Sequence, residues 1–288
     1  MEINMSDKKL VLGVILCILG QVFIQIAVVF VAFLSLPELL ESLVMSLLYV
    51  CLTFLFVKWM AEKFLHRDLA DVRVTKIKPD IIWVVELGAG VVLPIFLYVM
   101  FIPGKWEVFP LSPLRMCTTF LKAFGCIGLG AALAEELLFR GVVLKLVEIK
   151  FGTKWALILP AVFWAFLHLL SADFSQGVSS FVRVFSVTYV GFVFSVITVA
   201  TGSIWSSVFF HAMWNFITSG VILVGDKAND HVMFNYVSTR GNVFLTGGEN
   251  GLDGSVITTI CYTLVMVLAV GVSKFVQRKK AEEKGGSI

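Results

Sequence analysis

Long apolar stretches separated by short polar connections run through the whole chain. A helix must contain about 20 mostly apolar residues to cross the roughly 30 Å hydrocarbon core of a bilayer. By this measure the pattern predicts an all-α, polytopic membrane protein with about eight transmembrane helices. The predicted spans are residues 10–34, 39–58, 81–102, 117–149, 154–171, 180–201, 203–224 and 256–276.

The composition supports the bilayer as the surrounding medium. Hydrophobic residues make up 58% and charged residues 15% of the 288 positions, whereas soluble domains average about 45–50% and about 25%. The net charge of +3 does not indicate a nucleic-acid partner, because the basic residues gather at the ends of the apolar stretches. We find no repeat and no linker, so residues 1–288 are expected to form a single integral membrane domain.

The basic residues also predict the orientation in the membrane. Sixteen of the 23 Lys and Arg residues lie in the N-terminus, the 58–80 loop, the 145–154 turn or the C-terminal tail. The connections on the opposite side carry far fewer basic residues. By the positive-inside rule both termini are cytoplasmic, in agreement with an even number of spans. The basic residues of the opposite side are Lys105, Arg115, Arg183, Lys227 and Arg240.

Three charged residues stand close together inside the fourth predicted span: Glu135, Glu136 and Arg140. A charged side chain at the centre of a membrane helix costs about 2.5 to 3.5 kcal/mol, so such residues pair with one another and serve a function. Glu136 and Arg140 are four residues apart in the favourable order for an ion pair. Glu135 points about 100° away from Glu136 around the helix. One carboxylate is therefore expected to be paired, and the other available.

Two histidines and an asparagine lie in neighbouring spans. Glu135 and His168 are both about fifteen residues from the 145–154 turn, so they lie at equal depth, roughly 22 Å along consecutive antiparallel helices. His211 and Asn215 are four residues apart on the seventh span and share a face. These positions predict a catalytic cavity formed by the fourth, fifth and seventh spans.

The residue types in this cavity suit hydrolysis. Glu135 with a neutral His168 could hold and deprotonate a water molecule. His211 and the Asn215 amide could stabilise an oxyanion at a scissile carbonyl, with Glu136 and Arg140 in support. The chain has no HExxH motif of the zinc proteases. A divalent metal such as zinc, bound by Glu135, His168 and His211, remains an alternative.

The order of these motifs resembles a known family. Glu135-Glu136-x-x-x-Arg140, an aromatic residue four positions before His168, and His211-x-x-x-Asn215 resemble the CPBP (CAAX protease and bacteriocin-processing, or Abi) intramembrane proteases. The eukaryotic Ras-converting CAAX endopeptidase belongs to this family. The resemblance covers residues 117–224. The family usually has Phe where this chain has Trp164.

The resemblance carries expectations about activity and site. It implies an intramembrane endopeptidase in which Glu135 and His168 activate water and His211 and Asn215 stabilise the oxyanion. The family is named for metalloproteases, although its eukaryotic member is similar to a glutamate-dependent enzyme. Substrates in the family include prenylated CAAX proteins and bacteriocin or signalling peptides, so the expected partner is a membrane-associated protein or peptide. The glycine-rich residues 247–255 resemble a segment of bacterial members, which favours a bacterial cell membrane.

The sequence leaves two other functions open. One is a non-catalytic membrane scaffold or bacteriocin-immunity protein of the same fold. The other is a proton-coupled secondary transporter, which is less favoured because the chain shows no inverted repeat. For the protease we expect a site that opens to the cytoplasm or the inner leaflet.

Overall fold

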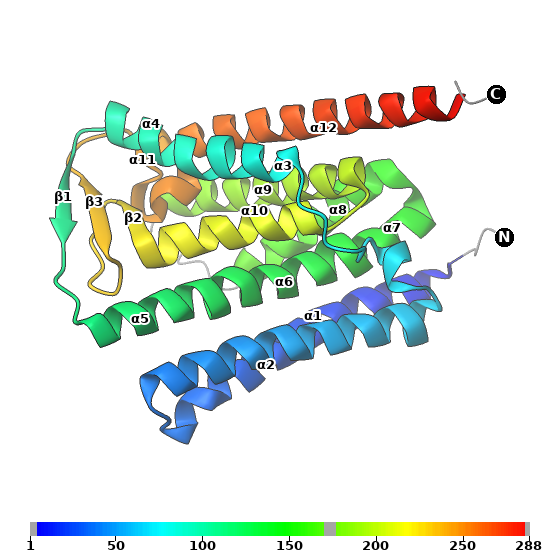
Figure 1. Cartoon of the computed structure of the whole chain (residues 1–288), viewed down its shortest axis with the longest axis horizontal. Coiled ribbons are helices and arrows are strands. Elements are labelled where there is room, and N and C mark those ends of the chain that lie inside the picture. The colour runs from blue at the N-terminus through cyan, green and yellow to red at the C-terminus, as the bar shows by residue number, and fades with distance from the viewer. Residues whose placement is uncertain (1–4, 170–176, 286–288) are drawn as a thin grey trace.

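The computed structural model of the chain describes residues 5–169 and 177–285. Its first element is a helical hairpin of α1 (Asp7–Phe30) and α2 (Glu38–Trp59), shown in blue in Figure 1. Ser6 begins α1 by accepting a hydrogen bond from the backbone N–H of Lys9, which satisfies one of the free donors of a helix start. Short 3₁₀ and π turns extend the two helices through Val31–Leu34 and Met60–Leu65.

The next helix is assembled from three pieces. They are α3 (Ile81–Val85), the π-helical segment Glu86–Val92 and α4 (Leu93–Phe101). Asp80 begins α3 by accepting a hydrogen bond from the backbone N–H of Ile82. Strand β1 (Gly104–Val108) follows directly.

A nearly continuous helical run then extends over the stretch that contains the predicted fourth span. Ser112 caps its start, and Gly152 ends it at φ +80°, a backbone conformation that favours glycine. The run alternates between α and π geometry, and π turns inside helices are frequent at functional sites. Its parts are α5 (Pro113–Leu121), η5 (Lys122–Gly130), α6 (Ala131–Glu135), η6 (Glu136–Val143) and α7 (Leu144–Phe151).

Three further helices pack against this run. They are α8 (Thr153–Leu169), α9 (Val178–Thr201) and α10 (Trp205–Phe216), which continues as a π turn through Ile217–Val221. The last two residues of the predicted fifth span, 170 and 171, lie outside the described residues.

A small sheet closes one end of the bundle, and the sequence did not predict it. Its strand order is β1-β3-β2, where β2 is Ile222–Gly225 and β3 is Phe234–Ser238. β3 pairs antiparallel with β1 and parallel with β2. The predicted seventh span is therefore wrong at its end, because the chain becomes extended at Ile222. The chain finishes with α11 (Val243–Thr246), η9 (Gly248–Gly254) and α12 (Val256–Gly285).

The membrane class is confirmed. Among the described residues, five helices are long and apolar enough to cross a membrane, and α8 is a shorter apolar helix. All eight predicted stretches are helical over most of their length, but the number of crossings stays a prediction. The five are Asp7–Leu34, Glu38–Leu65, Ile81–Phe101, Val178–Thr201 and Gly248–Lys279.

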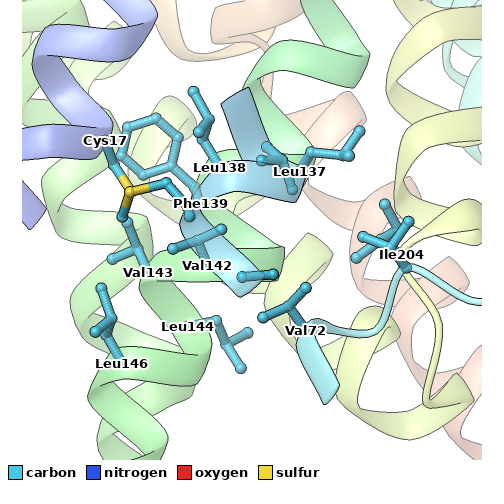
Figure 2. Packing of buried hydrophobic residues seen from close by; sticks show 14 of the residues in the cluster. Cys17, Val72, Leu137, Leu138, Phe139, Val142, Val143, Leu144, Leu146 and Ile204 are labelled. Carbon is cyan, nitrogen blue, oxygen red and sulfur yellow. The ribbon is translucent and has the colours of Figure 1, made fainter. Parts of the chain in front are cut away.

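The two ends of the molecule differ. Both described ends of the chain and the turn between α7 and α8 lie at one end, and the sheet lies at the other (Figure 1). Apolar side chains of η6 and α7 pack against Cys17 of α1, Val72 and Ile204 (Figure 2). This cluster fills the interior between the candidate site and the end that carries the termini.

Candidate active site

Glu136 and Arg140 form a buried ion pair at the bottom of the site. Arg140 Nη1 donates a hydrogen bond to Glu136 Oε1 at 3.1 Å, and both side chains are 0% exposed. This is the ion pair expected from their spacing. The guanidinium also lies 4.6 Å from the Trp164 ring and 5.4 Å from the Phe194 ring. These cation–π contacts help to compensate the loss of water around the buried cation.

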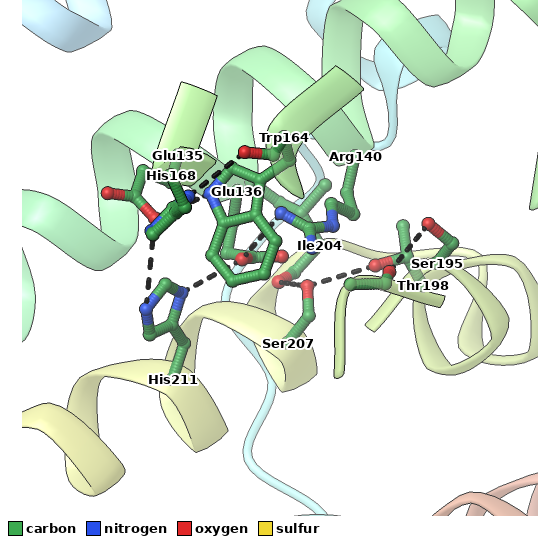
Figure 3. Close-up of polar contacts among 11 residues, drawn as sticks. Glu135, Glu136, Arg140, Trp164, His168, Ser195, Thr198, Ile204, Ser207 and His211 are labelled. Atoms are coloured by element: carbon green, nitrogen blue, oxygen red, sulfur yellow. Dashed lines mark hydrogen bonds and ion pairs between the residues drawn. The ribbon is translucent and has the colours of Figure 1, made fainter. Parts of the chain in front are cut away.

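His211 lies between the two glutamates (Figure 3). Its Nδ1 donates to Glu136 Oε1 at 2.9 Å, and its Nε2 is 4.0 Å from Glu135 Oε2. The ring stacks on Phe194 with centroids 5.2 Å apart. Glu136 therefore fixes one edge of the imidazole, and the other edge faces Glu135.

Glu135 has a partner that the sequence pattern did not predict. The indole Nε1 of Trp164 donates to Glu135 Oε2 at 2.7 Å. Trp164 lies one turn before His168 on α8, and His168 Nδ1 donates to the Trp164 carbonyl at 2.9 Å. In a neutral ring this bond makes Nε2 of His168 the acceptor. Trp has an N–H donor that the family's usual Phe lacks, so this replacement is the sequence feature that could have predicted the contact.

Asn215 lies one helical turn beyond His211 on α10. Its Nδ2 donates to the carbonyl oxygen of Ile127 at 3.2 Å. An amide nitrogen carries two hydrogens, so one remains for another acceptor. The carbonyl of Ile127 thus fixes the amide plane at the edge of the cavity.

A cavity of about 470 Å³ joins these groups. Glu135, His168, His211 and Asn215 line it, whereas Glu136 and Arg140 lie behind its wall. The elements that form it include α6, α8 and α10, which lie in the predicted fourth, fifth and seventh spans. They also include α9, η9 and α12, which the sequence did not implicate.

Polar residues from the second half of the chain complete the wall. Asp253 of η9 lines the cavity and accepts a hydrogen bond from Trp214 Nε1 at 2.8 Å. Trp214 lies between His211 and Asn215 in sequence, and Arg183 of α9 also lines the cavity. Asp253 belongs to the glycine-rich residues 247–255. Its acidic side chain is the sequence feature that could have indicated a place in the site.

The arrangement does not fit the zinc site that the sequence left open. Zinc binds nitrogen and oxygen ligands at about 2.0–2.2 Å, usually four of them. Among residues 5–169 and 177–285, no group of three or more His, Cys, Asp or Glu side chains is placed to hold a metal ion. Glu135, His168 and His211 are instead oriented by Trp164 and Glu136. We therefore assign no catalytic step to a metal.

The comparison with known families agrees with the motifs. Residues 117–217 match the family of type II CAAX prenyl endopeptidases, Rce1-like. This match confirms the resemblance to the CAAX proteases. The Rce1-like stretch contains all six predicted site residues and ends seven positions before the predicted core boundary at 224. Asp253 lies outside the Rce1-like stretch. No curated protein sequence matches the chain.

Proposed function

We propose that the protein is an intramembrane endopeptidase that hydrolyses a peptide bond in a membrane-associated protein or peptide, such as a prenylated CAAX-type protein or a peptide precursor. The observation that carries the proposal is the position of His211 between Glu136 and Glu135 at the end of a cavity. The Rce1-like match supports a protease function for this chain.

Glu135 is the proposed general base. Its Oε2 is held by the Trp164 indole, so the carboxylate keeps one orientation toward the cavity that His168 also lines. Water placed between Glu135 and His168 gives a proton to Glu135 and adds its oxygen to the scissile carbonyl carbon. When the C–N bond breaks, the same proton passes to the leaving amine. The products are one carboxylic acid and one amine, which exchange a proton to give a carboxylate and an ammonium group.

His211 and Asn215 are the proposed oxyanion donors. The protonated His211 ring can direct Nε2–H at the developing negative charge, while Nδ1–H stays on Glu136. The second amide hydrogen of Asn215 points from the same helix face. Glu136 and Arg140 are supporting residues, because they hold His211 without reaching the cavity.

Substitution of Glu135 tests the chemistry. Glu135→Gln keeps the shape and can still accept from Trp164, but it cannot take a proton. Loss of a general base costs roughly 100- to 10,000-fold in rate, so cleavage should fall by at least about 100-fold while the melting temperature stays near that of the wild type. The measurement compares peptides released from membranes of cells that carry each variant. Glu62→Gln, an exposed acid far from the cavity, is the matched control and should cleave normally.

Arg140→Ala separates support from catalysis. It leaves the buried Glu136 with only His211 as its partner. Breaking a buried ion pair costs about 3–5 kcal/mol, so both stability and activity should fall. The non-catalytic scaffold would be favoured instead if Glu135→Gln and His211→Ala both left the peptide profile and the biological activity unchanged.

A further inference from the structure

The cavity extends from Glu135 toward the end of the molecule that carries the sheet. Beyond the histidines its wall includes Leu223 of β2 and Glu249 and Asn250 of η9. The Glu249 side chain is 41% exposed and pairs at 2.8 Å with Lys227, which is 74% exposed. The cavity thus reaches surface residues at the sheet end.

The opposite direction is closed. Behind the histidines lie Glu136 and Arg140, both fully buried. Next come Leu137 and Leu138, which pack with Ile204 in the apolar cluster of Figure 2. A polypeptide cannot pass through this layer to the end that carries the termini.

The charge distribution assigns the two ends to sides of the membrane. The segments that contain sixteen of the 23 Lys and Arg residues lie at the end with the termini, away from the sheet (Figure 1). The connections at the sheet end carry only five. By the positive-inside rule the sheet end is non-cytoplasmic. An opening at this end differs from the sequence expectation of a site that opens to the cytoplasm or the inner leaflet.

We propose that this cavity takes its substrate from the non-cytoplasmic face of the membrane. This rests on the proposed protease function and narrows its substrate class to a polypeptide segment exposed at the outer leaflet. A prenylated C-terminus made and kept in the cytoplasm does not reach Glu135 by this route. Arg183 and Asp253 line the path, so a peptide backbone meets polar groups of both charges on its way in.

Accessibility labelling tests the side of the opening without requiring any activity. In a variant whose five cysteines are replaced by alanine, Lys227→Cys marks the sheet end and Lys63→Cys marks the terminus end; both lysines are exposed. A membrane-impermeant maleimide added to intact cells should label Lys227→Cys, and should label Lys63→Cys only after permeabilisation. The reverse pattern overturns the proposal.

Blocking the path tests the route. Ser186 lines the cavity on α9 and lies outside the proposed machinery. Modification of Ser186→Cys by the same reagent from outside intact cells should reduce cleavage products to the level of Glu135→Gln cells, with no effect on the cysteine-free parent. Continued cleavage after complete modification overturns the route. If the labelling is as expected but Glu135→Gln changes no peptide, the protease function fails and the orientation stands.

Discussion

The Trp164 indole gives Glu135 a fixed geometry that a phenylalanine at the same position cannot give. Its N–H lies 2.7 Å from Glu135 Oε2, while its ring covers the Arg140 guanidinium and meets the edge of His168. One side chain thus touches the proposed general base Glu135, the buried Arg140 and His168. We infer that Trp164 is a positioning residue for Glu135.

Trp164→Phe isolates the hydrogen bond from the packing. The ring contacts with Arg140 and His168 remain, but the donor to Glu135 is lost. Hydrogen bonds to charged groups contribute about 1.5–3 kcal/mol, so cleavage should fall about 10-fold or more. The membrane-peptide comparison measures this, and Trp155→Phe is the control, because Trp155 lies on the same helix and is 53% exposed. Equal loss in both variants, or in neither, would contradict the positioning role.

The sequence predicted different roles for the two glutamates but not the contacts that create them. The four-residue spacing of Glu136 and Arg140 is local, so it could be recognised without a structure. The bond from His211 to Glu136 joins helices 75 positions apart. Its existence depends on how α10 is rotated against η6, which helical periodicity alone does not define.

At the scale of elements, the site depends on close packing of α9 against α8 and η6. A Cβ atom added at Gly191 would lie 3.0 Å from the Trp164 ring and 3.1 Å from Arg140 Nη2. The absence of a side chain at this position allows α9 to approach both residues. Gly191 therefore helps to determine how closely the α9 wall of the cavity approaches Trp164 and Arg140.

Gly191→Leu should force α9 away from α8. Overpacking of a buried contact costs about 1–3 kcal/mol, so the melting temperature in detergent should fall. Cleavage should fall as well, because Trp164 moves from Glu135. Gly271→Leu on α12 is the matched control, since nothing lies within 4 Å of its added Cβ. A Gly191→Leu protein with wild-type melting and cleavage would show that this contact does not set the site.

The helices could be predicted from the sequence, and the sheet could not. Twenty-residue apolar stretches are a strong and local signal. Strands β1 and β3 have five residues each, and their pairing aligns Gly104 with Ser238, a contact that no local pattern encodes. β2 continues the apolar stretch of α10, so its residues Ile222–Gly225 look like the end of a span.

At the scale of the whole molecule, the proposed catalytic groups come from one stretch of the chain, and part of the cavity wall comes from another. The Rce1-like stretch supplies Glu135, His168 and His211. The last part of the chain supplies Asp253 and Tyr262, and Tyr262 packs against Phe210 and Trp214. The family match thus covers the proposed catalytic groups, and the remaining helices complete the enclosure around them.

A chain truncated to residues 1–238 tests this division. It keeps the sheet and the whole Rce1-like stretch but lacks η9 and α12. Without them Trp214 loses its acceptor Asp253. The cavity also opens sideways to lipid, where a water molecule beside Glu135 finds few hydrogen-bond partners. The truncated chain should still insert into membranes, as immunoblots of membrane fractions would show, but should release no cleavage products. Co-expression of residues 239–288 as a separate chain should restore cleavage, since α12 packs on α9 and the segment Glu86–Val92 through non-covalent contacts alone. Full cleavage by residues 1–238 alone would mean that the Rce1-like stretch forms the working cavity without the last helix.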